Sequence, residues 1–251
     1  MQQKNKYDQL RFVLVETSHP GNIGAAARAI KTMGFGQLYL VNPRFEDALQ
    51  QPEAIAFASG AQDVLDNAKI VSSVKEALND CSFVVAVSAR LREFSPPVLE
   101  AREFATQFAA FAVGNTALVF GNERYGLPNE IVTSCNALVN ISANPNYSSL
   151  NLAQAIQVLA YEARMAIRTS VDDLLTMSPM SKIGFSGELA SNQQIDGMYE
   201  HLEQALVKIK FLDADNPKKL MPRLKRLFAR TQLEVEEVNI IRGIAKKMME
   251  K

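Results

Sequence analysis

The sequence predicts an α/β fold, with a mostly parallel sheet covered by helices on both faces and a small all-helical unit at the C-terminal end. Short β-branched runs alternate with helical patterns from residue 10 to about residue 168. Several of these runs are apolar at successive positions, which is typical of strands buried on both faces of a parallel sheet. After residue 168 the composition changes, first to a linker and then to helical periodicity alone.

Length and composition fit a globular protein of one large domain or two smaller ones. The chain has 251 residues, of which 47% are hydrophobic, with 27 Lys plus Arg against 27 Asp plus Glu. A chain of this kind buries a sufficient core and is not disordered. No run approaches the roughly 18 apolar residues of a membrane-spanning helix, and residues 1–9 lack the apolar core of a secretory signal.

The two cysteines, Cys81 and Cys135, do not form a metal-binding motif, because there is no CxxC and no neighbouring His. We therefore expect reduced thiols in a cytoplasmic protein without a structural metal.

Five short apolar runs are predicted to be strands, and the pattern by itself predicts an ordinary doubly wound sheet. They cover residues 11–16, 37–42, 82–88, 116–121 and 137–142, and a weaker run at 69–72 is a candidate sixth strand. Helical patterns lie between them, at residues 24–33, 73–79, 97–108 and 150–168. The last helix repeats apolar residues at helical spacing, namely Leu152, Ile156, Leu159, Ala160 and Ala163. Residues 1–168 are therefore expected to form one α/β domain.

Residues 169–187 are a predicted linker, because Ser178-Pro179 and two glycines give this stretch little packing capacity. Three helices are expected in the following domain, residues 188–251. Ser191 and Gln194 are placed to cap the first helix, and Pro217 is expected at the first position of the second. Thr231 and Glu234 have the spacing of a capping box for the third. The apolar faces are Ile195, Tyr199, Leu202, Leu206 and Ile209 on the first helix, and Val238, Ile241, Ala245 and Met248 on the third.

The neutral total charge hides a basic segment. Between residues 208 and 230 there are eight Lys and Arg residues against two Asp, a local excess of +6. Such a segment is either a solvated helix face or a surface that follows the phosphates of a nucleic acid. Only Phe211 and Phe228 are aromatic there, so base stacking is not expected. The residues chosen as RNA-binding candidates are Lys218, Lys219, Arg223 and Arg226.

Three polar loops follow predicted strands, where ligands collect in open α/β sheets. In residues 16–28, Gly21 and Gly24 allow a close backbone approach, and Arg28 lies in the helix that follows. In residues 119–128, a strand ends in Gly121 and continues through Asn-Glu-Arg to a second Gly. In residues 144–153, one of two serines is expected to cap the long helix. The phosphate loops GxGxxG and GxxxxGK[ST] are missing, which disfavours nicotinamide and P-loop enzymes.

These three segments, in this order, resemble the three motifs of the SPOUT RNA methyltransferases. They are Glu-Thr-Ser-x-x-Gly-Asn-Ile-Gly-Ala-x-Ala-Arg at 16–28, Phe-Gly-x-Glu-x-x-Gly-Leu at 120–127 and Asn-x-x-x-Ser-Ser-Leu-Asn-Leu-Ala at 144–153. The resemblance is to the TrmH-like branch, which methylates ribose 2′-hydroxyls, and within it to the bacterial tRNA (cytidine/uridine-2′-O-)-methyltransferases that act at position 32 of the anticodon loop. It covers about residues 10–168, whereas the tail is weakly diagnostic.

The resemblance implies features that the pattern alone does not give. It implies a C-terminal trefoil knot, which general topology rules would have excluded, and a pocket for S-adenosylmethionine formed by that knot. It also implies an obligate homodimer, in which Arg28 of one subunit acts on the cofactor side of the other. The implied cofactor-binding residues are Val87, Ser88, Ala89, Gly121, Ile141, Ser148, Ser149 and Leu150.

The implied reaction is attack of a ribose 2′-oxygen on the sulfonium methyl group. The hydroxyl is barely ionised at neutral pH, so its proton must leave during the attack. The resemblance points to Arg28, but arginine almost never deprotonates, so we favour stabilisation of the developing alkoxide and positioning of a phosphate. Asn22, Glu123, Ser149 and Asn151 are expected to orient Arg28 and the ribose. For His19 a hydrogen-bonding role is favoured over that of a base, and His201 is expected to be structural.

Three alternatives stay open at this point. The same chemistry on another tRNA position or on ribosomal RNA is compatible with motifs shared across the branch. A non-catalytic RNA-binding module is disfavoured because all the candidate catalytic residues are present. An unrelated α/β nucleotide-binding enzyme is disfavoured because its phosphate loop is missing. Cofactor binding by calorimetry separates this last class from the others.

Overall fold

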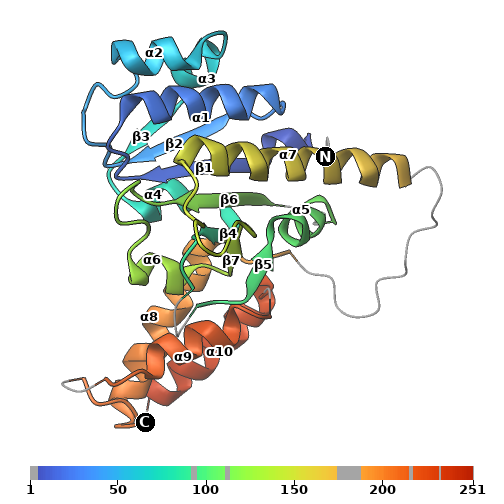
Figure 1. Cartoon of the computed structure of the whole chain (residues 1–251). Coiled ribbons are helices and arrows are strands. Elements are labelled where there is room, and N and C mark those ends of the chain that lie inside the picture. The colour runs from blue at the N-terminus through green and yellow to red at the C-terminus, as the bar shows by residue number, and fades with distance from the viewer. Residues whose placement is uncertain are drawn as a thin grey trace.

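The larger part of the molecule is a seven-stranded sheet with the order β3-β2-β1-β6-β4-β7-β5 (Figure 1). The structure, a computed structural model, describes residues 5–91, 95–110, 114–173, 188–214, 217–231 and 233–250. All strand pairs of this sheet in the described residues are parallel. This confirms the predicted fold class. The strands are β1 (Leu10–Val15), β2 (Gln37–Val41), β3 (Lys69–Val71), β4 (Cys81–Val87), β5 (Val98–Glu100), β6 (Asn115–Phe120) and β7 (Ala137–Asn140).

Helices cover both faces of the sheet, as the apolar runs predicted (Figure 1). In β1, Leu10, Phe12 and Leu14 enter one apolar cluster, whereas Val13 and Val15 enter the other, because successive side chains of a strand point to opposite faces. The first cluster is closed by α1 (Pro20–Thr32), α2 (Pro52–Ala58), α3 (Gln62–Asp66), α5 (Ala101–Ala110) and α7 (Leu152–Asp173). The second is closed by α4 (Val74–Leu78) and α6 (Asn129–Ser134), and a short 3-10 helix, Lys6–Asp8, precedes β1.

The five predicted strands and the weaker sixth are all present, but one strand was missed. β5 lies within the predicted helix 97–108, whose first helical residue is Ala101. It is only three residues long and follows Pro96-Pro97, so it carries almost no strand pattern of its own. The short helices α2, α3 and α6 were also missed.

α2 escaped prediction because its apolar pattern is inverted. Ala54 and Ala58 are buried, whereas the larger Ile55 and Phe57 are exposed. Only alanines fit on the buried side because α2 lies directly on α1. A Cβ at Gly24 would clash with the carbonyl oxygen of Ala54. The expected close approach at Gly24 is confirmed, and the approaching group is the backbone of α2.

The tail forms three helices around its own apolar cluster, namely α8 (Asn192–Lys208), α9 (Leu220–Phe228) and α10 (Val235–Met249). The capping box of Ser191 and Gln194 is confirmed. Two start signals were wrong. α9 begins at Leu220, three residues after Pro217, and Thr231 donates its hydroxyl to the carbonyl of Phe228. The capping box of α10 is formed by two acidic residues, Glu234 and Glu237, which the positive end of a helix favours.

The boundary expected at residue 168 lies inside α7, which continues to Asp173. The rest of the predicted linker, residues 174–187, lies outside the described residues. The tail packs on the sheet face that carries α4 and α6, where α8 contacts α4 and β4 and α9 contacts α6 (Figure 1). An ion pair of 3.6 Å between Lys75 and Glu200 crosses this contact.

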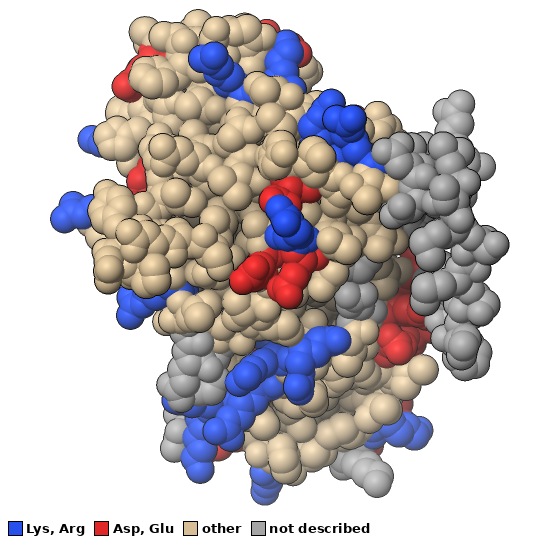
Figure 2. Space-filling model, turned by 45° about the vertical axis from the view of Figure 1, so that its right-hand side comes forward, with Lys and Arg blue, Asp and Glu red and all other residues tan. Residues whose placement is uncertain are grey.

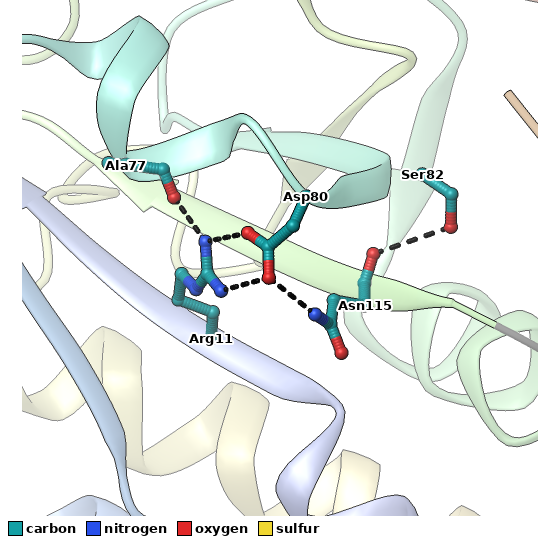
Figure 3. Close-up of polar contacts among 5 residues, drawn as sticks. All are labelled: Arg11, Ala77, Asp80, Ser82 and Asn115. Atoms are coloured by element: carbon teal, nitrogen blue, oxygen red, sulfur yellow. Dashed lines mark hydrogen bonds and ion pairs between the residues drawn. The ribbon is translucent and has the colours of Figure 1, made fainter. Parts of the chain in front are cut away.

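A polar cluster around the buried side chain of Arg11 lies at the amino ends of β1, β4 and β6 (Figure 3). The side chain of Arg11 is 7% exposed and donates to both oxygens of Asp80, at 2.7 and 3.0 Å, and to the carbonyl of Ala77. Asn115 donates to Asp80 at 2.8 Å, and the guanidinium carbon of Arg11 lies 4.1 Å from the Tyr39 ring centroid. This cluster ties three strands and the end of α4 together.

β7 lies between β4 and β5, although β5 precedes β6 and β7 in the chain. The trefoil knot implied by the resemblance concerns the path of the chain after β7 and stays a prediction. Among the described residues, no helix combines the length and the apolarity that a membrane span requires.

Candidate active site

The three polar motifs meet at the carboxyl edge of the sheet. The first follows β1 and leads into α1, the second follows β6, and the third leads into α7. β1 and β6 are hydrogen-bonded neighbours, and α7 packs beside α1. Asn122 fastens the second loop to the first, since its side-chain amide donates to the carbonyl of Glu16 at 2.7 Å. The edge at which parallel sheets bind ligands therefore carries all three motifs.

Glu123 holds the start of α1 from across the sheet. Its Oε2 accepts from the backbone N–H and the hydroxyl of Ser18, at 2.9 and 2.8 Å, and its Oε1 accepts from the N–H of His19 at 3.3 Å. The N-cap residue of α1, His19, makes no side-chain cap, and the carboxylate of Glu123 instead holds the backbone just before the helix, near its positive end. Partial burial raises the pKa of Glu123, but hydrogen bonds from Asn22 and Ser18 outweigh it and lower the pKa below its usual value.

Two asparagines extend this arrangement to the third motif. The amide of Asn22 donates to Glu123 Oε1 at 2.9 Å, and its oxygen accepts from the amide of Asn151 at 3.0 Å. The Asn151 oxygen in turn accepts from the N–H of Ala153, at 2.9 Å, in the first turn of α7. The expected serine cap was therefore wrong, because Asn151 performs the capping. One chain of hydrogen bonds, Glu123–Asn22–Asn151, now joins all three motifs.

Arg28 is not part of that chain. It lies six residues after Asn22 on α1, or about 9 Å along the helix axis. Its side chain is exposed, and it forms no ion pair or hydrogen bond with another residue of the described ranges. A surface salt bridge, the ordinary role of an arginine on an exposed helix face, is therefore not seen in that part of the chain. The guanidinium is available to a group outside the chain.

The expected cofactor residues lie at three neighbouring strand ends. Val87, Ser88 and Ala89 end β4, Gly121 follows β6 and Ile141 follows β7, and the sheet order there is β6-β4-β7. Ser148, Ser149 and Leu150 are exposed and precede α7. Half-buried Val87 and Ile141 and partly exposed Leu150 give apolar surface for an adenine, beside the exposed loop backbone. These residues fit S-adenosylmethionine.

Sequence reasoning missed two residues that shape this edge. Asn140, the last residue of β7, donates to the carbonyls of Ser88 and Ala89 at 3.0 and 3.2 Å. Ser18 supplies two of the four donors to Glu123. The sequence contained a weak indication of both residues, because Ser18 lies inside the first motif and Asn140 is a polar residue at the end of an apolar strand. The two histidines are not in the hydrogen-bond chain through their rings: His19 contributes its backbone N–H, and His201 lies on α8 with a buried Nδ1.

Gly121 contributes to the site through its lack of a side chain. A Cβ there would clash with the backbone of Gly126 and Leu127. The second loop therefore folds back directly onto Gly121, and its shape requires glycine at this position.

The RNA-binding candidates are separate from this edge. Lys218 and Lys219 precede α9, whereas Arg223 and Arg226 lie on it, and all four side chains are exposed. Figure 2 shows a band of Lys and Arg side chains across the lower part of the molecule, where the tail lies in Figure 1.

Comparison with known proteins gives matches over both parts of the chain. Residues 9–161 match the SpoU rRNA Methylase family, and residues 193–251 match the tRNA methyltransferase TrmJ C-terminal domain. A relative from Pseudomonas aeruginosa (strain UCBPP-PA14), tRNA (cytidine/uridine/adenosine-2′-O-)-methyltransferase TrmJ, is 45% identical over 240 residues, covering 94% of this chain and 92% of its own.

Two solved structures extend the comparison. The crystal structure of TrmJ from Z. mobilis ZM4 is 30% identical with a TM-score of 0.79, covering 96% of this chain and 99% of its own. A structure that concerns the 2-OH methylation of C/U34 on tRNA is 28% identical with a TM-score of 0.52. It covers 65% of this chain and 99% of its own, so it is similar to a part of this chain only.

Proposed function

Because the chain belongs to the SpoU rRNA methylase family and its last helices match the TrmJ C-terminal domain, we propose that it is a tRNA methyltransferase. It transfers a methyl group from S-adenosylmethionine to the 2′-hydroxyl of cytidine or uridine at position 32 of the anticodon loop. The observation that carries this proposal is the hydrogen-bond chain Glu123–Asn22–Asn151, which joins the three motifs at one edge of the sheet.

The cofactor supplies an electrophilic methyl group when bound, and we place it against Val87, Ser88, Ala89, Gly121, Ile141, Ser148, Ser149 and Leu150. Support comes from the position of residues 87–89, Gly121 and Ile141 at three neighbouring strand ends, with residues 148–150 just before α7. The hydrogen bonds of Asn140 hold the carbonyls of Ser88 and Ala89 in fixed positions. The trefoil knot belongs to the same proposal, and β7 lying between β4 and β5 supports it.

Arg28 stabilises the developing alkoxide of the ribose and positions a substrate phosphate. Its guanidinium is exposed and has no partner within the described ranges, so it is open to an anionic ligand. It does not act as the base, because arginine almost never deprotonates.

Glu123, Asn22 and Asn151 are positioning residues. The carboxylate of Glu123 already accepts four hydrogen bonds from its own chain, so it is not free to take a proton from the ribose. Asn22 and Asn151 use both their amide and their oxygen within the chain. Their role is to fix the start of α1, on which Arg28 stands, relative to the exposed Ser149 and the third loop. Alignment of this kind is worth up to about 7–11 kcal/mol in a bimolecular reaction.

The enzyme acts as a homodimer. The outer face of α7 carries Val158, Tyr161 and Met165, which are 36%, 49% and 37% exposed and follow one another at helical spacing. Such an apolar stripe is typical of a surface that a second subunit covers. α7 packs beside α1, so a partner on this stripe lies near the helix of Arg28.

The tail holds the rest of the tRNA through Lys218, Lys219, Arg223 and Arg226, and the protein works in the cytoplasm, where tRNA is modified. Support comes from the four exposed cations and from the relatives that match over 94% of this chain, tail included. The solved structure that concerns position 34 covers only 65% of this chain. We therefore favour position 32 over position 34 or a ribosomal RNA site.

The test is to incubate the protein with total tRNA and S-adenosylmethionine and to map the methylated nucleotide by mass spectrometry. We expect a 2′-O-methylated pyrimidine at position 32, and far less of it in the same time with the Arg28→Ala variant. Methylation at position 34 would agree with the proposed 2′-O-methyl transfer but contradict the proposed position 32. Methylation of ribosomal RNA alone would contradict tRNA as the substrate. Cofactor binding without any methyl transfer would point to a non-catalytic RNA-binding module.

The dimer is tested by mixing two inactive variants. Arg28→Ala removes the alkoxide stabiliser, and Ala89→Trp blocks the cofactor site at an exposed position. Gly121 is unsuitable for this purpose because any side chain there disrupts the loop. Partial activity in the mixed dimer is expected if Arg28 acts across the interface. No recovery, with heterodimers shown to form, places the whole site within one subunit.

A further inference from the structure

A groove lies between the tail and the α/β domain. Its volume is about 310 Å³, and it is lined by Leu91, the segment Ser95-Pro96-Pro97-Val98, and two arginines of the tail, Arg226 and Arg230. Leu91 follows β4 by four residues, and Pro97-Val98 leads into β5. The groove therefore joins α9 to the segment that follows the expected cofactor loop.

The two sides of the groove differ in chemistry. The α/β side is apolar apart from Ser95, and it includes Leu91 at 58% and Val98 at 46% exposure. The tail side presents two exposed guanidinium groups, and no Asp or Glu is among the described residues that line the groove. Neither Arg226 nor Arg230 forms a side-chain ion pair or hydrogen bond with another residue of the described ranges. Two adjacent positive charges without a neutralising partner favour an anionic ligand.

We propose that this groove binds one sugar–phosphate unit of the tRNA, with the phosphate between Arg226 and Arg230 and the sugar against the apolar wall. The proposal rests on the proposed tRNA substrate and goes beyond it, because it adds Arg230 and the α/β-domain wall to the RNA contacts. Arg226 is thereby separated from Lys218, Lys219 and Arg223, which do not line the groove.

The wall also sets what the groove recognises. Among the described residues that line it, none is aromatic, so they offer no ring on which a base would stack. Contacts to phosphate and sugar fix the register of an RNA but carry no sequence information. The groove therefore positions the tRNA on both domains at once, and its loss affects all tRNA substrates alike.

The groove is continuous with the cofactor loop through short hydrogen bonds. The Ser88 hydroxyl accepts from the N–H of Arg90 at 3.1 Å, and Asn140 donates to the carbonyl of Ser88. Leu91 is the next residue after Arg90. The apolar wall of the groove thus follows directly in the chain after the loop that is expected to hold the methyl donor.

The first experiment compares two double variants in tRNA methylation at several salt concentrations. Arg226→Gln/Arg230→Gln is expected to raise the KM for tRNA about tenfold, with kcat and the Kd for S-adenosylmethionine unchanged. The slope of log affinity against log salt is expected to fall by about one, because one phosphate contact is lost. The matched control is Arg242→Gln/Lys246→Gln, which removes the same charge from α10 of the same tail.

The second experiment tests the wall on the other domain. Leu91→Glu places a carboxylate opposite the two arginines and is expected to raise the KM for tRNA about tenfold, whereas Leu91→Gln, which removes the apolar contact but adds no charge, is expected to raise it less. A patch confined to the tail predicts no effect of Leu91→Glu, and that result would overturn the proposal. A change in cofactor Kd without a change in KM for tRNA would overturn it too.

Three outcomes separate this proposal from the proposed function. Unchanged KM for the arginine variant at every salt concentration overturns the groove while tRNA methylation stands. An equal loss in the α10 control shows a general charge effect and also overturns it. If the unmodified protein methylates no tRNA, the proposed function fails, and direct tRNA binding by the same variants still decides whether the groove holds RNA.

Discussion

The two edges of the sheet each carry a buried or half-buried polar network, but the two networks differ in what they leave free. At the amino edge, Arg11 and Asp80 pair with each other and with Ala77 and Asn115 of the same fold (Figure 3). At the carboxyl edge, Glu123 has no cationic partner among its hydrogen bonds and instead orders backbone N–H groups and Asn22.

This difference separates stability from function. The Arg11–Asp80 pair neutralises itself, so it ties strands together and offers nothing to a ligand. The Glu123 network fixes loops at the end of the sheet, while Arg28 on the same helix as Asn22 stays unpaired within the described ranges. A charge without a partner is costly to bury, so Arg28 is exposed, and exposure makes it available to a substrate.

The largest effect is expected for Arg28→Ala. Loss of a group that stabilises transition-state charge lowers turnover by about 10²–10³-fold. Stability and cofactor Kd stay unchanged, because the side chain has no ion pair or hydrogen bond to lose within the described ranges. Turnover of Arg28→Lys is also expected to be low, since the single ammonium charge of lysine does not reproduce the planar, forked guanidinium of arginine. Single-turnover kinetics at saturating tRNA check this, and near-normal turnover of the Ala variant would refute the assignment.

Glu123→Gln is expected to lower both the stability of the protein and its turnover. The substitution removes the charge and turns an amide N–H toward donors such as the N–H groups of Ser18 and His19. Unfolding free energy falls by about 1 kcal/mol because partly buried donors such as Ser18 lose their acceptor, and turnover falls about tenfold or more because α1 is misplaced. Urea unfolding and methylation assays on one preparation measure both. A loss of stability alone would make Glu123 purely structural.

Asp80→Asn is expected to lower stability without changing turnover. Asp80 is 59% exposed, so solvent screens it, and the expected loss is about 1–2 kcal/mol. Methylation measured well below the melting temperature stays as in the unmodified protein. A tenfold fall in turnover would show that the two edges are coupled and that the amino edge is not purely structural.

The same variant tests the pH dependence of stability. Burial raises the pKa of Asp80, but hydrogen bonds and charge from Arg11 outweigh it, so its folded pKa is lowered. A carboxyl of this kind stabilises fully above its unfolded pKa of about 4 and loses this contribution as the pH falls through the folded value. We expect the unfolding free energy of the unmodified protein to decrease as the pH is lowered from about 5. In Asp80→Asn the unfolding free energy is expected to change less steeply with pH. Equal slopes would contradict the assignment.

The smallest effect on turnover is expected in the tail. Replacing Lys218, Lys219, Arg223 and Arg226 by Gln leaves kcat and cofactor Kd unchanged and raises the KM for tRNA. If each charge meets one phosphate, the slope of log affinity against log salt flattens by roughly 3. A salt titration of tRNA binding measures this. Unchanged slopes would make the basic segment an ordinary solvated helix face.

The sequence was sufficient for the features that local pattern encodes. Apolar runs such as residues 11–16 and 82–88 predicted buried strands, and Leu152, Ile156 and Leu159 predicted the buried side of α7. The motifs at 16–28, 120–127 and 144–153 gave the candidate residues. Short elements were missed where the local signal was weak or inverted, as in β5 and in α2, whose exposed side carries Ile55 and Phe57.

The tertiary structure alone decided how those residues act on one another. Glu123 and Asn22 are 101 residues apart, and Asn151 and Asn22 are 129 apart, so no local pattern relates them. It also assigned the capping of α7 to Asn151, the close approach at Gly24 to α2, and Arg226 and Arg230 to a groove against Leu91. The physical reason is range: periodicity and propensity fix which face of an element is buried, whereas hydrogen bonds between distant loops depend on how the elements pack.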